Sequence, residues 1–205
     1  MLKQLFGSAL ISLVLVTGTA NAALVVDTGV PNNTFGQLAL DSNDWIAGQV
    51  NFSQSLQINS IKGYLDDLGS GGGNFNVVLY KDNGSNKIGN SLYSGTATYD
   101  TVGWNGLSGL NWSVNAGKYW VGFEVTDINA PSFVAAQYAS IGLAHTAYTD
   151  GSNQNSYHYL DGLNFGVQVD ATTVAAVPEP EAYAMLLAGI GLMGFMVRRR
   201  KSEQA

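Results

Sequence analysis

Alternation of apolar and other residues is the feature of this chain that most restricts its fold. Residues 75–79 place Phe, Val and Leu on every second position, and residues 119–125 repeat the pattern with Tyr, Val, Phe and Val. A period of two is typical of a β-strand that turns one face toward a core. Trp120 falls on the opposite face of its strand, together with Glu124. Because residues 23–175 contain no convincing helical stripe, the pattern predicts an all-β domain.

Turn residues separate these stretches. Residues 82–86, Asp-Asn-Gly-Ser-Asn, lie between two apolar runs, and the Asn-Gly pair favours positive φ, so a β-hairpin is expected there. Eight or more short strands joined by such turns indicate a single antiparallel β-sandwich, with jelly-roll topology favoured over an immunoglobulin-like one. The other expected strands cover residues 44–52, 56–65, 91–100, 110–114, 132–138 and 163–170.

The N-terminus has the parts of an export signal. Lys3 supplies a positive charge, residues 5–16 form a short apolar region, and Ala20-Asn21-Ala22 provides small residues for cleavage after Ala22. The chain is therefore predicted to consist of a signal peptide (1–22), a β-sandwich ectodomain (23–175) and a C-terminal segment (176–205).

The C-terminal segment combines a rigid spacer, a short apolar helix and a basic end. Pro178, Glu179 and Pro180 favour extended backbone, so a helix can begin only after them. Residues 182–197 carry no charge and would form about 24 Å of helix, which is shorter than a typical hydrocarbon core of ~30 Å. The cations Arg198, Arg199, Arg200 and Lys201 would hold their end on the cytoplasmic side of the inner membrane and leave the ectodomain outside.

These three elements, in this order at the terminus, resemble the PEP-CTERM sorting signal of Gram-negative bacteria. The resemblance implies recognition by an exosortase, with Pro178, Glu179 and Pro180 as the recognition motif, residues 182–197 as a transmembrane helix and Arg198, Arg199 and Arg200 as its stop. It further implies a membrane-inserted precursor, cleavage near Pro-Glu-Pro, delivery to the cell surface or extracellular matrix, and an association with exopolysaccharide and biofilm. The alternative is an ordinary C-terminal tail anchor.

A second resemblance covers most of residues 45–125. A Gln-x-Phe-like strand at Gln49–Phe52 (with one extra residue), a Leu-Tyr-x-Asp strand end at Leu79–Asp82 and an Ala-Gly-x-Tyr-Trp start at Ala116–Trp120 are similar to choice-of-anchor ectodomains. Those families are β-sandwiches that as a rule have no assigned activity, so this resemblance supports the fold and the anchoring theme.

The charge of the ectodomain argues against nucleic acid as a partner. Residues 23–177 contain four lysines and twelve acidic residues, a net charge of −8. A polyanionic backbone needs a lysine or arginine patch that replaces its counterions, and four scattered lysines do not predict one.

The chain shows no arrangement that predicts an enzyme, and no cofactor is expected. It contains no Cys, which excludes disulfides, thiolate metal sites and a Cys nucleophile. His145 and His158 are thirteen residues apart without a nearby zinc partner, and the chain has no Gly-x-Ser-x-Gly motif. Asp66 and Asp67 are adjacent, so on a strand they would point to opposite faces rather than act together.

Calcium and sugar remain candidate ligands. Oxygen ligands for calcium are available in either of two groups, although neither contains a twelve-residue calcium loop and turn chemistry explains both equally well. The first group is Asp66 and Asp67 with Asp82, Asn83 and Asn86, and the second is Asp150 and Asp161 with Asn153 and Asn155. Aromatic faces for a pyranose ring are Trp120, Tyr148, Tyr157 and Tyr159, three of them in or beside a polar loop. The alternative for these aromatics is packing within the fold.

The sequence therefore predicts an exported, exosortase-sorted surface or matrix protein with a structural or adhesive role linked to exopolysaccharide. The alternative is a carbohydrate-binding, lectin-like module, with or without a calcium requirement.

Overall fold

A computed structural model describes residues 21–31, 38–42, 44–67, 73–125, 133–135, 142–149, 156–162, 164–174 and 184–194. The chain divides into two units, Met1–Thr173 and Val174–Ala205. The first unit contains all twelve described strands, and the second contains a described helix at residues 184–194.

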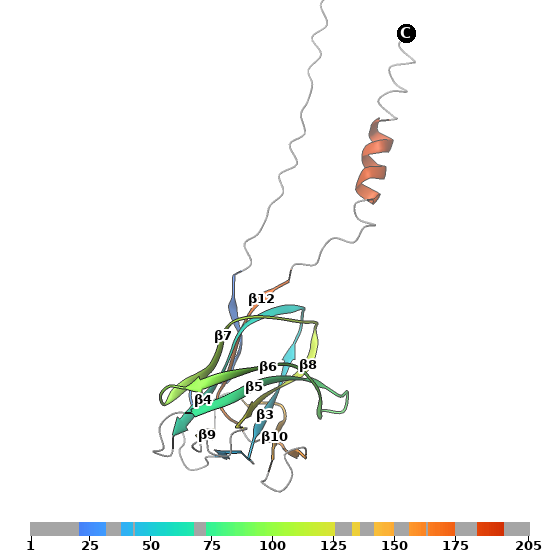
Figure 1. The fold of residues 1–205 in the computed structure, drawn as a ribbon. Helices are drawn as coiled ribbons and strands as arrows, with labels where there is room; N and C mark the ends of the chain where they lie inside the picture. The colour runs from blue at the N-terminus through green and yellow to red at the C-terminus, as the bar shows by residue number, and fades with distance from the viewer. Residues whose placement is uncertain are drawn as a thin grey trace, which may run out of the picture. The chain divides into compact units, whose positions relative to one another are not determined.

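The first unit is built from two antiparallel sheets (Figure 1). The first sheet has the order β1-β12-β4-β9-β2, and β7 also pairs with β4. Its strands are β1 (Ala23–Asp27), β12 (Val167–Thr173), β4 (Leu56–Asp67), β9 (Phe133–Ala135), β2 (Leu38–Leu40) and β7 (Gly103–Val114). The second sheet has the order β11-β10-β3-β8-β5-β6. Its strands are β11 (His158–Leu160), β10 (Thr146–Tyr148), β3 (Ile46–Phe52), β8 (Gly117–Glu124), β5 (Gly73–Asp82) and β6 (Ile88–Tyr99).

The eight principal strands have jelly-roll connectivity. In chain order they are β1, β3, β4, β5, β6, β7, β8 and β12, and the pairs are β1·β12, β3·β8, β4·β7 and β5·β6. The first strand thus pairs with the last, the second with the seventh, the third with the sixth and the fourth with the fifth. This nested pairing is the double Greek key of a jelly roll, so the predicted sandwich and its favoured topology are confirmed.

The core lies between the two sheets and takes alternate residues from each strand. In β8, Tyr119, Val121 and Phe123 are buried in it, as the period-two pattern predicts. In β4 and β12 the corresponding core side chains include Ile61 and Val169, which are fully buried. The Phe123 ring of β8 lies 6.2 Å from the ring of Phe75 on the neighbouring strand β5. It also lies 6.1 Å from the ring of Phe165, in the segment before β12 of the other sheet.

The β5–β6 turn follows from its sequence. Gly84 and Asn86 both have positive φ, at 90° and 55°, as the Asn-Gly and Asn residues of this turn allow. The Asn83 amide donates to the Lys87 carbonyl at 3.0 Å, and the Gly84 amide donates to Asp82 Oδ1 at 2.8 Å. The predicted hairpin is therefore confirmed.

One strand is much longer than predicted. β7 begins at Gly103, seven residues before the expected start, because its glycines interrupt the apolar pattern. The fold requires glycine at position 106, since a Cβ there would lie 2.1 Å from the Ile61 carbonyl oxygen of β4. The predicted strand at 163–170 is shifted and is found as β12, and only 133–135 of the expected 132–138 strand is described.

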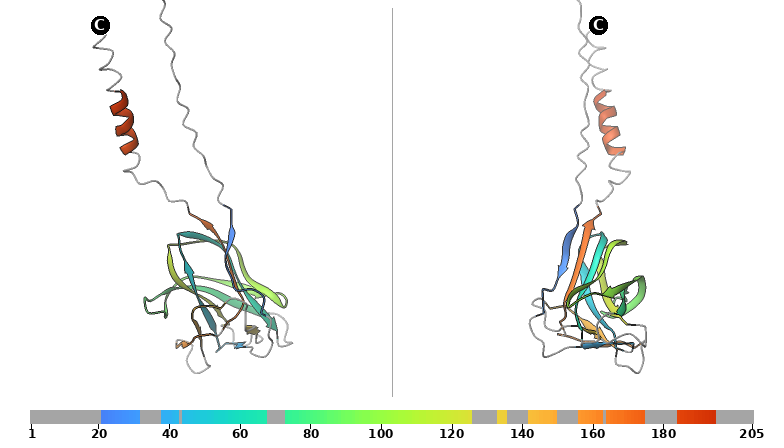
Figure 2. Two further views of the ribbon diagram at one scale, coloured as in Figure 1. Left: turned by 180° about the vertical axis from the view of Figure 1, so that it is seen from behind. Right: turned by 60° about the vertical axis from the view of Figure 1, so that its left-hand side comes forward.

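The two ends of the sandwich domain lie beside each other. β1 and β12 run side by side (Figure 2), and Ala23 at the start of β1 pairs with Ala171 near the end of β12. The predicted signal peptide cleavage site directly precedes β1, and most of that peptide lies outside the described residues.

Candidate functional site

The described part of the C-terminal segment is a helix with apolar side chains on all sides. It covers residues 184–194, about 16 Å at the usual rise, within the predicted 182–197 helix. Met185, Leu187 and Met193 are each more than 60% exposed. Within the described residues, no helix reaches the length and hydropathy of a membrane span. Pro178, Glu179, Pro180, Arg198, Arg199 and Arg200 lie outside the described residues.

The outer face of the second sheet, the face turned away from the core, holds a second small apolar cluster. Trp120 of β8 is fully buried there in one cluster with Ala47 of the adjacent β3 and Ala147 of β10. The Tyr159 ring of β11 covers it edge-on, with the ring centroids 5.7 Å apart. The predicted face of Trp120 is confirmed, but a buried ring offers no surface to a sugar, so its assignment as a sugar contact is wrong.

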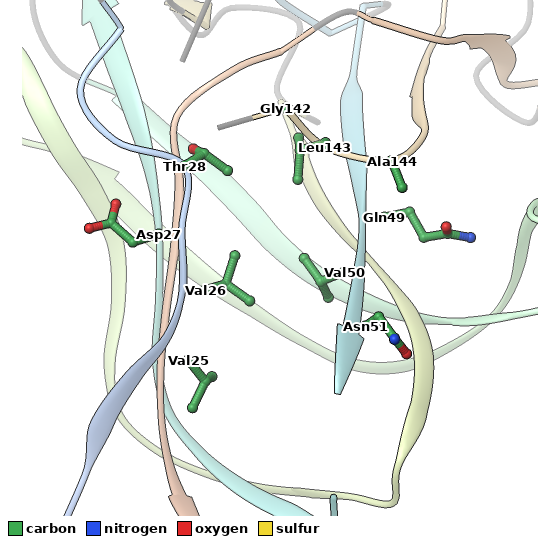
Figure 3. Close-up of a pocket in the computed structure, with 10 residues that line it drawn as sticks. All are labelled: Val25, Val26, Asp27, Thr28, Gln49, Val50, Asn51, Gly142, Leu143 and Ala144. Atoms are coloured by element: carbon green, nitrogen blue, oxygen red, sulfur yellow. The ribbon is translucent and has the colours of Figure 1, made fainter. Parts of the chain in front are cut away.

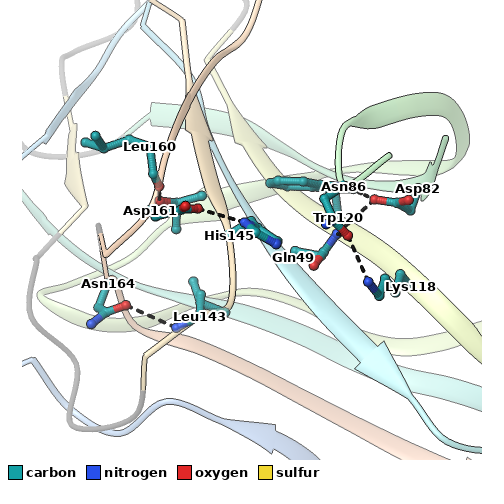
Figure 4. A network of polar contacts seen from close by, with 11 residues as sticks. Gln49, Asp82, Asn86, Lys118, Trp120, Leu143, His145, Leu160, Asp161 and Asn164 are labelled. Carbon is teal, nitrogen blue, oxygen red and sulfur yellow. Dashed lines mark hydrogen bonds and ion pairs between the residues drawn. The ribbon is translucent and has the colours of Figure 1, made fainter. Parts of the chain in front are cut away.

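Trp120 is fixed to the β5–β6 hairpin through Asp82 (Figure 4). Asp82 Oδ2 accepts hydrogen bonds from Trp120 Nε1 at 2.9 Å and from Gln49 Nε2 at 2.8 Å. Burial favours a raised pKa for Asp82, but the hydrogen bonds from Trp120, Gly84, Gln49 and the Asn86 backbone outweigh it and lower the pKa below its ordinary value. Asp82 therefore remains an anion whose oxygens are occupied by N–H donors.

A buried carboxylate lies further along the same face. Glu124 of β8 is 6% exposed, and its Oε1 accepts hydrogen bonds from the Tyr80 hydroxyl and, at 3.0 Å, from the Tyr157 hydroxyl. Burial raises the pKa of Glu124, and the two hydrogen bonds offset this only in part. Burial and the Glu124 charge raise the pKa values of both tyrosines. The sequence analysis did not identify this cluster, although an acidic residue within an apolar strand is its visible signal.

The three predicted sugar-contact tyrosines are engaged to different degrees. The Tyr157 hydroxyl is bound to Glu124, and the Tyr148 ring packs on His158 at 5.6 Å. The Tyr159 hydroxyl accepts a hydrogen bond from the Ile88 amide at 3.0 Å, and Lys87 Nζ lies 5.6 Å from its ring centroid. Tyr159 nevertheless keeps 39% of its surface exposed.

Each of the two predicted groups of calcium ligands is described only in part, and the first group draws on both sheets. Asp66 lies on β4 of the first sheet, whereas Asp82 ends β5 of the second, and Asp161 of the other group follows β11. Asp161 Oδ1 contacts His145 Nδ1 at 2.7 Å. Outside the described residues lie the side chain of Asp67 and all of Asp150, Asn153 and Asn155. Among the described residues, no three or more His, Asp and Glu side chains are grouped so that they could hold a metal ion.

A cleft opens at the edge of the sandwich where β1 and β3 face each other (Figure 3). It has a volume of about 340 Å³, and its wall is mainly apolar, with Val25, Val26, Val50 and Leu143. The Thr28 hydroxyl at its rim bonds to the Phe165 carbonyl and the Val167 amide. Its polar side chains do not form an acid–base pair.

The fold and the tail together define a cysteine-free jelly-roll domain followed by a short apolar helix. Residues 176–201 match the PEP-CTERM protein-sorting motif. This match supports an exported protein that is processed by an exosortase and has a surface- or membrane-associated precursor. A search of curated proteins found no match to the chain.

Proposed function

We propose that the jelly-roll domain is the part of the protein that remains after sorting and that it serves as a structural or adhesive component of the cell surface or matrix, in contact with exopolysaccharide. The role proposed is one of binding rather than catalysis. One observation carries the proposal: β12 ends at Thr173, and the matched sorting motif begins at residue 176. Cleavage near Pro-Glu-Pro therefore leaves every described strand of both sheets intact.

The intact mass of the protein from surface and matrix fractions of the producing bacterium tests this proposal. We expect a product that lacks Arg198–Lys201, and we expect the full C-terminus to persist in cells without exosortase. Replacing Pro178, Glu179 and Pro180 together with Ala should block processing, whereas Glu203→Gln, outside the matched motif, should not. A mature pool that retains Arg198–Lys201 would refute processing.

A lectin-like role is the second candidate, and Tyr159 favours it. Its exposed ring lies beside Lys87, so an apolar face and a hydrogen-bond donor are presented together. A glycan array measured with and without a chelator tests this role and its calcium dependence. Absence of binding in both conditions would exclude the lectin, and binding that survives chelation would exclude calcium as a requirement.

A further inference from the structure

Three of the four lysines of the ectodomain lie at one corner of the sandwich. Lys81 is the second-to-last residue of β5, Lys87 lies in the β5–β6 turn and Lys118 lies near the start of β8, whereas Lys62 lies on β4 of the other sheet. Lys81, Lys87 and Lys118 are exposed. The domain as a whole carries twelve acidic residues, so this corner is a local concentration of positive charge on an acidic protein.

Lys81 and Lys118 line the same hollow. The hollow has a volume of about 420 Å³, and its remaining wall is the β7–β8 turn at residues 115–117 with Tyr119, Asp82 and Gly84. This volume falls within the roughly 300–1,000 Å³ of small-molecule sites. Lys81 also lines two neighbouring hollows, of about 550 and 290 Å³, which include the exposed Leu92 and the ring of Tyr93.

Lys118 is held in place by a hydrogen bond, and neither lysine of the hollow is neutralised by a carboxylate in the described part of the chain. Asn86 Oδ1 accepts a hydrogen bond from Lys118 Nζ at 2.8 Å and a weaker one from Gln49 Nε2 at 3.3 Å, as Figure 4 shows. Within the described residues, neither Lys81 nor Lys118 forms an ion pair. The one carboxylate in the wall is that of Asp82, whose oxygens already accept from Trp120, Gln49 and Gly84. The hollow therefore keeps positive charge for a ligand.

We propose that this hollow binds a carboxylate group of an acidic polysaccharide, such as a uronate residue. Two ammonium groups provide the charge, the amide side chain of Asn115 provides hydrogen bonds for hydroxyls, and Leu92 and Tyr93 provide an apolar surface for a sugar ring. The proposal rests on the proposed function outside the cell and specifies its partner: the glycan is anionic. A nucleic acid fits less well, because its closely spaced phosphates would extend from this corner onto an acidic surface.

A second copy of the chain is the competing occupant. A stable interface between proteins needs on the order of 800 Å² on each partner with buried apolar anchors. The walls of these hollows instead consist mainly of backbone, amide and lysine groups, with Leu92 as the large exposed apolar side chain among them. The composition of these walls therefore favours a sugar over a second copy of the chain as the occupant.

The test measures binding of the full chain in detergent to polygalacturonate and, as a neutral polymer, to dextran. We expect binding to polygalacturonate that weakens as salt is raised, and no binding to dextran. The Lys81→Gln/Lys118→Gln variant should lose about tenfold or more in affinity, whereas Lys62→Gln should bind like the wild type. Unfolding curves confirm that the variants are folded.

A second measurement avoids substitution altogether. Carbodiimide treatment of the wild-type complex should join uronate carboxylates to Lys81 and Lys118, and peptide mass spectrometry should find fewer adducts on Lys62. Equal binding to dextran, full affinity in the double variant, or self-association that is lost in the double variant without any glycan binding would each overturn the proposal. Mass analysis of the same variants reports sorting separately, since Lys81 and Lys118 lie outside the matched motif.

Discussion

Trp120 and Asp82 are joined by a 2.9 Å hydrogen bond on the outer face of the second sheet, from the indole Nε1 to Oδ2. The bond links β8 to the last residue of β5, so it holds the β5–β6 hairpin against the sheet. The same ring supports Tyr159 from the segment that covers this face. One buried side chain thus positions both the lysine-bearing hairpin and β11.

Trp120→Phe should destabilise the domain by roughly 1.5–3 kcal/mol, because the half-buried carboxylate of Asp82 loses a charge-assisted hydrogen bond. The loss should appear as a lower midpoint in urea unfolding at neutral pH. Trp112→Phe is the matched control: this ring stacks on Tyr93 at 5.2 Å, and a Phe ring retains most of that contact. Equal losses in the two variants would contradict the importance of the Trp120–Asp82 bond.

Glu124→Gln should make the domain more stable at neutral pH relative to the wild type. Because the folded pKa of Glu124 is raised above its ordinary value of 4.5, the native state binds this proton more tightly than the unfolded state. The free energy of unfolding of the wild type therefore falls as pH rises above 4.5 and through the folded pKa. In Glu124→Gln, the free energy of unfolding measured across this pH range should no longer show that decrease. The exposed Asp100→Asn should keep it, and an unchanged pH profile in Glu124→Gln would refute the assignment.

Gly106→Ala should lower the free energy of unfolding by about 1–3 kcal/mol, as is usual when extra volume is forced into a packed site. The added methyl would meet backbone atoms of β4, which cannot move aside as a side chain tip would. Thermal unfolding measures the effect. Gly189→Ala provides the comparison, since nothing lies within 4 Å of its added Cβ and the midpoint of the sandwich should not change.

A chain that ends at residue 177 should unfold at the same temperature as the full chain, because it retains all twelve described strands. A chain that ends at Gly166 lacks β12 and with it the buried side chains of Val167, Val169 and Ala171. The shorter chain should lose more than about 5 kcal/mol in free energy of unfolding, which is comparable to the stability of a whole domain. We therefore expect that the chain ending at Gly166 does not fold. Circular dichroism and limited proteolysis distinguish the two outcomes, and a folded chain ending at Gly166 would contradict the central place of β12.

Local patterns in the sequence predicted the parts of the fold that local chemistry determines. The β5–β6 hairpin depends on Asn83 and Gly84, and the core face of β8 depends on alternation, so both were predictable. The burial of Trp120 was not, because Tyr159, which covers it, is 39 residues away in the chain. The Tyr80–Glu124–Tyr157 cluster was missed for the same reason: its members come together only after β5 and β8 have paired and the segment before β11 has packed on the second sheet.

The pairing of Ala23 with Ala171 has a mechanical consequence. β12 lies between β1 and β4 and is hydrogen-bonded to both, and its C-terminal end leads to the sorting motif. If the processed protein is attached through that end while its opposite pole carries a load, tension runs along β12. Backbone hydrogen bonds of antiparallel strands lie perpendicular to the strand direction, so this tension would shear both ladders at once rather than open them one bond at a time. The strand next to the attachment point is then also the one best placed to resist being pulled out.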